Sequence, residues 1–103
     1  MDQPNPLVPG QIVRSKAGHD KGTVFLVLEI ADAKHVWVTN GAQRPLARPK
    51  KKRVMHLQPY RDKISGIETM KQDTSWNDAK VRELLAPYTG NRRRRENVIK
   101  RCN

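Results

Sequence analysis

The chain has almost no cysteine: Cys102 is the single one among 103 residues. A lone cysteine excludes an internal disulfide and is typical of proteins in a reducing compartment. The three histidines, His19, His35 and His56, are scattered and have no second cysteine beside them, so the spacing of a zinc site is missing. We therefore expect no metal, no cofactor and no disulfide framework.

Long apolar runs are missing as well. The longest purely apolar run, residues 24–28, has five residues, whereas a helix that spans a bilayer needs about 20. Residues 1–6 are acidic and proline-rich rather than basic and then apolar, so we expect no signal peptide. The sequence therefore predicts a cytoplasmic protein that has no membrane partner.

The sequence also lacks a catalytic constellation. Asp20, Glu29 and Asp32 are near one another in sequence, but no nucleophile or metal ligand accompanies them. Neither a phosphate-loop lysine motif nor a G-x-G-x-x-G motif is present. We expect that the protein is not an enzyme.

What the chain has in excess is positive charge. It carries 21 Lys and Arg against 10 Asp and Glu, which gives a net charge of +11. Residues 44–56 hold six basic side chains and no acid, and residues 91–103 hold six more with Glu96 as their single acid. Clusters of this density are typical of nucleic-acid binders, because each bound phosphate releases a counterion. The alternative is a solvated surface that only keeps the protein in solution.

Short β-branched and apolar segments separated by turn residues predict a mostly β fold, a small antiparallel barrel. We expect its five strands at residues 11–16, 23–30, 35–39, 43–46 and 53–57. The side chains expected in the barrel interior are Val13, Val24, Leu26, Leu28, Val36, Val38, Leu46, Val54 and Leu57. Phe25 is expected in the core as well.

Two turns in this region carry glycine. Residues 17–22 include Gly18 and Gly22 and predict a tight loop, which Asp20 should order through hydrogen bonds to the backbone. Asn40 and Gly41 form a strong hairpin signal, because both residue types tolerate positive φ.

The barrel is assigned to residues 10–59, and the sequence predicts a different organisation on either side of it. Residues 1–9 are proline-rich and should form a disordered lead. Residues 60–74 are polar and should form a linker with one weak helical turn. Residues 91–103 form an arginine-rich tail.

A helix is predicted over residues 75–90. Ser75 can cap its first turn, with Asp78 as the partner three residues on. Pro87 should end the helix near Leu85 or Ala86. Its apolar stripe consists of Val81, Leu84, Leu85 and Tyr88.

One segment carries a family resemblance. Residues 13–22, Val-Arg-Ser-Lys-Ala-Gly-His-Asp-Lys-Gly followed by an apolar strand, look like a KOW motif. Together with Asn40-Gly41, the basic run 48–57 and the helix 77–85, they resemble small bacterial KOW-domain RNA-binding proteins, which are similar to KOW-bearing large-subunit ribosomal proteins of archaea and eukaryotes. The resemblance implies an SH3-like barrel that binds structured RNA, commonly ribosomal RNA. The tail 91–103 has no counterpart in that group.

We expect basic loops and the tail to contact RNA. Glycines let the 17–22 loop approach a phosphate closely, and Pro45 and Pro49 stiffen the basic run so that less entropy is lost on binding. Lysine acts as a point charge on phosphate, whereas arginine can also bind bidentately or stack on bases. The candidate RNA-binding residues are Arg14, Lys16, His19, Lys21, Arg44, Arg48, Lys50, Lys51, Lys52, Arg53, Arg92, Arg93, Arg94 and Arg95.

The two tryptophans could have a structural or a functional role. Trp37 could stack on an exposed base, but we favour a role at one end of the small core. Trp76 should dock the helix onto the barrel.

The expected partner is RNA, ribosomal RNA in the first place, with ribosomal proteins as further candidates and a monomer as the expected state. A protein-interaction module of the transcription or translation machinery is the alternative, and non-specific DNA binding is a third possibility.

Overall fold

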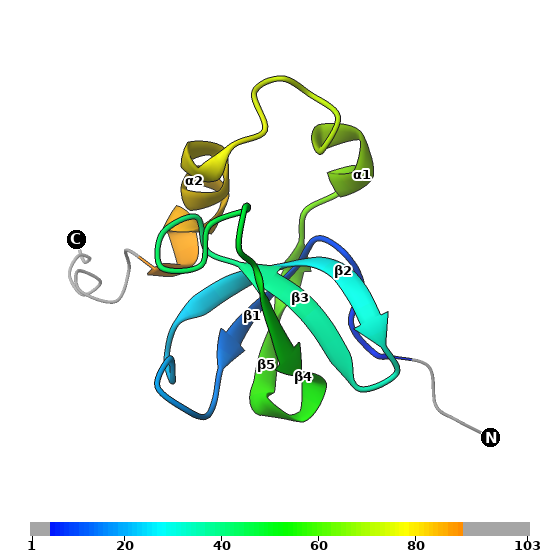
Figure 1. Cartoon of the computed structure of the whole chain (residues 1–103), viewed down its shortest axis with the longest axis vertical. Coiled ribbons are helices and arrows are strands. Elements are labelled where there is room, and N and C mark those ends of the chain that lie inside the picture. Colours follow the sequence, from blue (N-terminus) through cyan, green and yellow to red (C-terminus); the bar gives the residue numbers. More distant parts are fainter. Residues whose placement is uncertain (1–4, 90–103) are drawn as a thin grey trace.

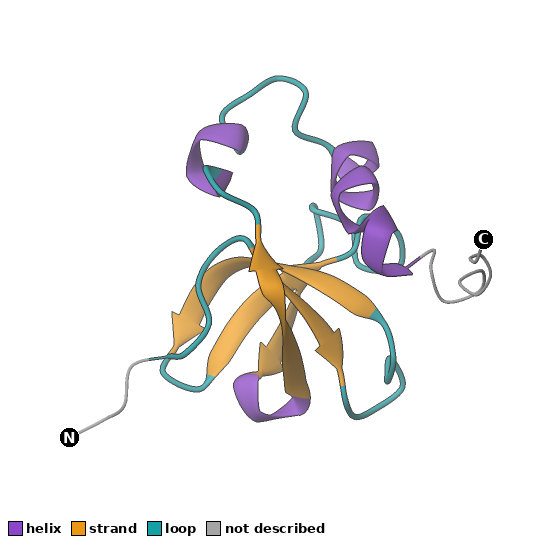
Figure 2. Ribbon diagram, turned by 180° about the vertical axis from the view of Figure 1, so that it is seen from behind, coloured by secondary structure: helices purple, strands orange, loops and turns teal. Residues whose placement is uncertain are grey.

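The structure is a computed structural model that describes residues 5–89. Five antiparallel strands form one sheet in the order β4-β3-β2-β1-β5 (Figure 1). The elements are β1 (Gln11–Ser15), β2 (Val24–Asp32), β3 (His35–Thr39), β4 (Lys50–Arg53), the 3-10 helix η1 (Val54–His56), β5 (Leu57–Lys63), α1 (Ile67–Met70) and α2 (Asp78–Thr89). Both α-helices lie at one end of the sheet and η1 lies at the opposite end (Figure 2). The mostly β class and the C-terminal helix are confirmed.

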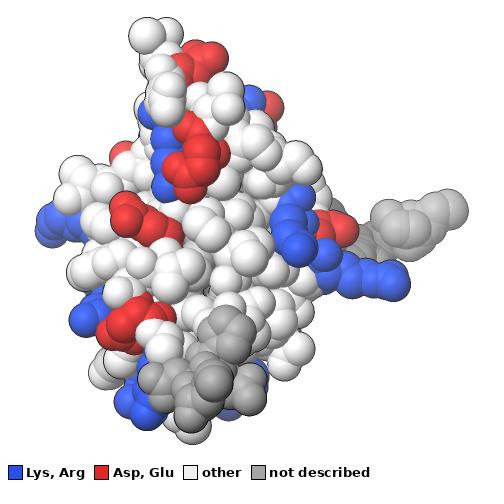
Figure 3. Space-filling model, turned by 90° about the vertical axis from the view of Figure 1, so that its right-hand side faces the viewer, with Lys and Arg blue, Asp and Glu red and all other residues white. Residues whose placement is uncertain are grey.

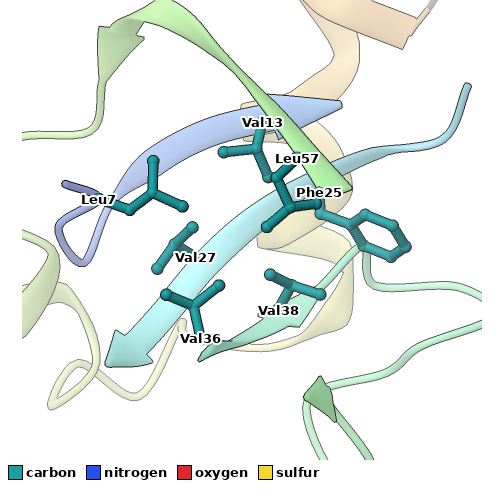
Figure 4. Packing of buried hydrophobic residues seen from close by; sticks show 7 residues of the cluster. All are labelled: Leu7, Val13, Phe25, Val27, Val36, Val38 and Leu57. Atoms are coloured by element: carbon teal, nitrogen blue, oxygen red, sulfur yellow. The ribbon is translucent and has the colours of Figure 1, made fainter. Parts of the chain in front are cut away.

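One face of the sheet curls around an apolar core. Side chains from β1, β2, β3 and β5 meet there, although β4 and β5 remain the two edges of the sheet. The cluster consists of Leu7, Val13, Phe25, Val27, Val36, Val38 and Leu57 (Figure 4). Val54 packs against it. Five of these eight residues, Val13, Val36, Val38, Val54 and Leu57, were expected inside the barrel. Burial of the sixth, Phe25, was also predicted.

The opposite face of the sheet has a core of its own. Ile12 on β1 and Val24 and Leu26 on β2 pack against Ile67 of α1 and against the buried stripe of α2. That stripe supplies Val81 and Leu85, with Trp76 and Tyr88 partly buried around it. The docking role predicted for Trp76 is therefore consistent with its position.

The prediction that Val24, Leu26 and Leu46 line the barrel interior is wrong. These residues belong to the helix-side core, and Phe25 and Val27 point to the curled side instead. Successive residues of a strand face opposite sides, so a strand buried on both faces reads as a continuous apolar run. The run 24–28 has no alternation that could have separated the two cores.

Two strand predictions also require correction. Residues 43–46 form no strand, and the fourth strand is the lysine run Lys50–Arg53. The fifth strand runs from Leu57 to Lys63 rather than over 53–57, and so occupies the start of the predicted linker. Lysine is rare in strands but common at sheet edges, where it discourages pairing with other chains. Pro59 is accommodated because β5 is the other edge.

The last helix begins later than the predicted residue 75 and continues past Leu85 and Ala86, where Pro87 was expected to end it. Asn77 rather than Ser75 caps it, since Asn77 Oδ1 accepts a hydrogen bond from the Lys80 amide at 2.9 Å. Pro87 lies inside the helix, which continues to Thr89. Because a proline in the last turn leaves the preceding turns intact, its effect on the helix end is weak here.

The expected disordered lead is ordered in its second half. Leu7 is buried in the curled core, and the Asn5 amide donates to the carbonyl of Asp32 at 2.9 Å. Residues 1–4 and 90–103 lie outside the described part of the chain. Within residues 5–89, no helix combines the length and the apolar character that crossing a membrane requires.

Candidate nucleic-acid interface

The lysine run forms the strand β4, and its side chains therefore lie on alternating faces of the sheet. Lys50 and Lys52 pair with Val38 and Val36, whose side chains enter the curled core, so they lie on that side. Lys51 pairs with Trp37, and Arg53 with His35, on the opposite face. The run does not present one continuous positive row, as a loop could.

Lys52 is an internal cation. Its side chain is 7% exposed, and its ammonium donates to Asp20 Oδ1 at 2.9 Å and to Ser15 Oγ at 3.0 Å. Its hydrogen bonds therefore go to groups of the fold itself. We leave Lys52 out of the interface proposed below.

Asp20 acts through this contact rather than through the backbone bonds expected of its side chain. Burial raises the pKa of its carboxyl, but hydrogen bonds from Lys52 and Ser15 and the charges of Lys52 and Lys50 outweigh that effect and hold the pKa below the ordinary 3.8. Its Oδ2 lies 3.6 Å from Lys50 Nζ. Asp20 thereby ties the β1–β2 loop to β4.

The β1–β2 loop, residues 16–23, is as tight as its glycines suggest. Gly18 and Gly22 adopt φ values of 84° and 90°, a region that side chains disfavour. Turn bonds from Lys21 N to Gly18 O, at 3.1 Å, and from Thr23 N to Asp20 O, at 2.9 Å, fold it. The loop exposes three candidate residues, Lys16, His19 and Lys21.

The β3–β4 loop, residues 40–49, is shaped by Asn40 and Gly41. Asn40 Oδ1 accepts from the amides of Ala42 and Arg44, each at 3.0 Å, and Asn40 N donates to Arg44 O at the same distance. The Asn-Gly signal therefore correctly marks a turn after Thr39. The chain leaves that turn as a loop that carries Arg44 and Arg48 rather than as a strand.

Helix α2 supports this loop, beside which it lies (Figure 1). Gly41 has φ 74°, and a Cβ built there would lie 2.6 Å from the carbonyl oxygen of Asp78. The Arg82 guanidinium donates to Gly41 O, and Asp78 Oδ1 accepts from Leu46 N at 2.8 Å. The helix thus fixes the position of the loop as well as covering the sheet.

A groove runs between the two loops and α2. It has a volume of about 520 Å³ and shares the wall residues Thr23, Asn40 and Gln43 with a neighbouring hollow of about 200 Å³. The groove is lined by Lys21, Gly22, Thr23, Val24, Asn40, Ala42, Gln43, Arg82, Leu85 and Thr89. The hollow is lined by His19, Asp20, Thr23, Phe25, Asn40, Gln43, Arg44 and Lys50.

Four of the predicted site residues line these two neighbouring hollows: Lys21 lines the groove, and His19, Arg44 and Lys50 line the smaller hollow. Arg82 joins them and was missed by the sequence analysis. The available signal was its position beside Val81 at the border of the apolar stripe of α2, where a long basic side chain can reach a neighbouring loop.

The remaining candidates do not line this groove. Arg14 and Lys16 flank a separate hollow beside the β1–β2 loop, together with Lys21. Arg48, Lys51 and Arg53 are exposed. The four tail candidates lie outside the described residues: Arg92, Arg93, Arg94 and Arg95.

Positive charge is not spread evenly over the molecule. On the face drawn in Figure 3, Asp and Glu side chains lie among the Lys and Arg side chains, and the positive charge there is interrupted. In the walls of the groove and the neighbouring hollow, by contrast, the one acidic residue among residues 5–89 is Asp20, which is engaged with Lys52. The groove is the more suitable place for a polyanion.

Trp37 belongs to neither core cluster, contrary to the role we favoured. It is half-buried on β3, with Lys51 opposite on one side and Glu29 opposite on the other. A carboxylate next to the ring is unfavourable for a nucleic-acid backbone, so we do not place Trp37 in the interface.

No group of three or more metal-ligating side chains occurs in the part of the chain that the structure describes. Neither models of protein families nor the sequences of curated proteins match this chain. The geometry of the groove and the charges around it therefore carry the functional argument.

Proposed function

We propose that the protein is a non-catalytic RNA-binding protein, with ribosomal RNA or the translating ribosome as its target. The observation that carries the proposal is that basic side chains from different elements lie around two neighbouring hollows. Lys21 comes from the β1–β2 loop, Arg44 and Lys50 come from the β3–β4 loop and the first residue of β4, and Arg82 comes from α2. The fold places all four around two neighbouring hollows that share wall residues, and among residues 5–89 the one acidic side chain in their walls is Asp20, which is paired with Lys52.

Folded RNA fits this arrangement for electrostatic reasons. Cations held close together repel one another, and a polyanion relieves that repulsion while releasing condensed counterions. Loops braced by Asp20 and by α2 hold the cations in place before binding, so less conformational entropy is lost when RNA arrives.

We further propose that the curled sheet is an SH3-like barrel of the KOW type. The strand order, the 3-10 helix between β4 and β5, and the curled core shared by β1, β2, β3 and β5 support this assignment. The tight loop with Gly18 and Gly22 lies where the KOW resemblance expects it.

Equilibrium binding of structured ribosomal RNA by paired alanine variants tests the function. Lys21→Ala/Arg44→Ala removes two charges at the groove, and Arg61→Ala/Lys63→Ala removes two exposed charges on β5. We expect the groove variant to bind at least about tenfold more weakly than the β5 variant, because lost phosphate contacts cost affinity one by one. Equal weakening would mean that only net charge matters.

A protein-interaction module remains the second candidate, because one observation favours it. Met55 is 63% exposed in η1, beside a mostly apolar hollow formed with Ala33, Lys34, Arg53 and Val54. Sedimentation through sucrose separates the two. Co-migration with ribosomal particles that is lost in high salt supports RNA binding, and salt-resistant co-migration supports docking on a protein.

A further inference from the structure

We propose that the groove between the β1–β2 loop, the β3–β4 loop and α2 holds an unpaired nucleotide of the bound RNA. This inference rests on the proposed function and specifies which feature of RNA is recognised. It goes beyond charge, because the groove has a shape and a lining of its own.

The lining suits a nucleotide. Val24 and Leu85 provide apolar wall, whereas Lys21 and Arg82 provide cations. Sites for small organic groups are concave and partly apolar, with a few polar groups and volumes of about 300–1,000 Å³. At about 520 Å³ the groove has room for a base and its sugar, and the adjoining Lys50 and Arg44 are placed for the neighbouring phosphates.

Arg82 is prepared for such a ligand. Its guanidinium donates to Gly41 O, which restrains the planar group beside the groove. Guanidinium planes stack on unpaired bases, and a group already held in one orientation loses less entropy on binding.

The side-chain amide of Gln43 can form a hydrogen bond with the edge of a base. Its Oε1 accepts from Asn40 Nδ2 at 2.9 Å, which orients the amide. Within residues 5–89 its amide nitrogen has no hydrogen-bond partner, so it remains a donor for a base carbonyl or ring nitrogen.

A paired base cannot enter the groove. In A-form RNA the base faces are stacked and the major groove is deep and narrow, so whole bases become accessible to a concave site only in loops, bulges and ends. A concave site walled by two loops and a helix therefore selects an extruded nucleotide over a regular duplex.

The test compares two labelled RNAs, a stem closed by a loop of randomised sequence and the same stem as a blunt-ended duplex. We expect the wild-type protein to prefer the looped RNA by at least about fivefold, the contribution of one stacked base. Equal affinity for the two RNAs would overturn the inference while leaving RNA binding intact. Failure to bind either RNA would overturn the proposed function and the inference with it.

A pair of matched variants tests whether the preference for looped RNA arises in the groove. Ala42→Leu fills the groove without changing charge, and Ala47→Leu adds the same bulk to the same loop outside the groove. We expect Ala42→Leu to lose the preference for the loop and keep duplex binding, whereas Ala47→Leu behaves as wild type. A preference that survives in folded Ala42→Leu protein would contradict the site.

Arg82→Lys provides a second test that does not depend on added bulk. It keeps the charge but removes the planar group, so the preference should fall while the salt dependence of duplex binding stays the same. Adenosine monophosphate distinguishes a free nucleotide from RNA as the ligand. Tighter binding of this mononucleotide than of the looped RNA would overturn the assignment to RNA.

Discussion

The buried pair of Asp20 and Lys52 is the residue-scale contact on which the interface depends. It joins the β1–β2 loop to the edge strand β4. Removing one member of a buried ion pair leaves the other charge desolvated and uncompensated, which lowers the stability of the folded protein strongly. The pair therefore has a stability role, and through the loop it has a positioning role.

Lys52→Ala should lower the free energy of unfolding by about 3 kcal/mol, the low end for a broken buried pair because Asp20 keeps some contact with solvent. Lys51→Ala is the matched control, since Lys51 is the exposed neighbour in the same strand. It should change stability by less than about 0.5 kcal/mol. Urea unfolding measures both, and equal effects would refute the internal role of Lys52.

Acid should weaken the same contact. The pKa of Asp20 is lowered in the folded protein, chiefly because hydrogen bonds from Lys52 and Ser15 outweigh the effect of burial. A lowered folded pKa means that this stabilisation is complete above the unfolded pKa of about 3.9 and is lost as pH falls through the folded value. Wild type should therefore lose more stability than Asp20→Asn in urea unfolding below pH 4. Parallel losses in the two proteins would contradict the pairing.

Tyr88 reports the anchoring of the end of α2 at alkaline pH. Its hydroxyl donates to Asp62 Oδ2, and this bond, with burial and the charge of Asp62, raises the pKa of Tyr88 to about 12. Since the folded pKa lies above the unfolded value of 10, the contact stabilises the fold below pH 10 and is lost as pH rises through 12. Absorbance titration should show one tyrosine ionising late in wild type and earlier in Asp62→Asn. An unchanged titration would disprove the bond.

At the scale of elements, α2 and the β3–β4 loop form one unit. The loop has no strand partner of its own, and it is held by Arg82 and Asp78 from the helix. The close approach at Gly41 makes this docking possible. A helix that looks like a cover for the sheet therefore also positions Arg44.

Gly41→Ala should separate this docking from simple backbone strain. Both Gly41 and Gly22 have positive φ, but a Cβ at Gly41 would meet the Asp78 carbonyl at 2.6 Å, and one at Gly22 would meet nothing within 4 Å. Gly22→Ala should cost about 1–2 kcal/mol from its backbone conformation, and Gly41→Ala should cost clearly more. Thermal unfolding of the two variants measures the difference. Equal costs would argue against the tight packing.

At the scale of the whole molecule, the sequence predicted what local patterns control. The mostly β class, the tight loop at Gly18 and Gly22 and the turn at Asn40 follow from residue types that favour those conformations. The two-sided core could not be predicted, because the run 24–28 is apolar throughout and does not reveal which residues face the helices.

The candidate site was predicted in part for the same reason. The glycine-containing loop made Lys21 a candidate and the basic run made Arg44 and Lys50 candidates, but their positions beside two neighbouring hollows follow from the fold. The burial of the Lys52 side chain depends on the register of β4 against β3. The position of Arg82 beside the groove depends on the docking of α2 against the β3–β4 loop. Both are tertiary facts that no local pattern encodes.

The salt dependence of RNA binding tests the central claim most directly. If Lys21, Arg44, Lys50 and Arg82 each contact a phosphate, the logarithm of the affinity for ribosomal RNA should fall linearly with the logarithm of salt concentration, with a slope near −3 or steeper, at about 0.7–0.9 per phosphate. Lys21→Ala/Arg44→Ala should flatten that slope by about 1.5, whereas Arg61→Ala/Lys63→Ala should leave it unchanged. An affinity that does not respond to salt, or a slope that both variants flatten equally, would contradict the account.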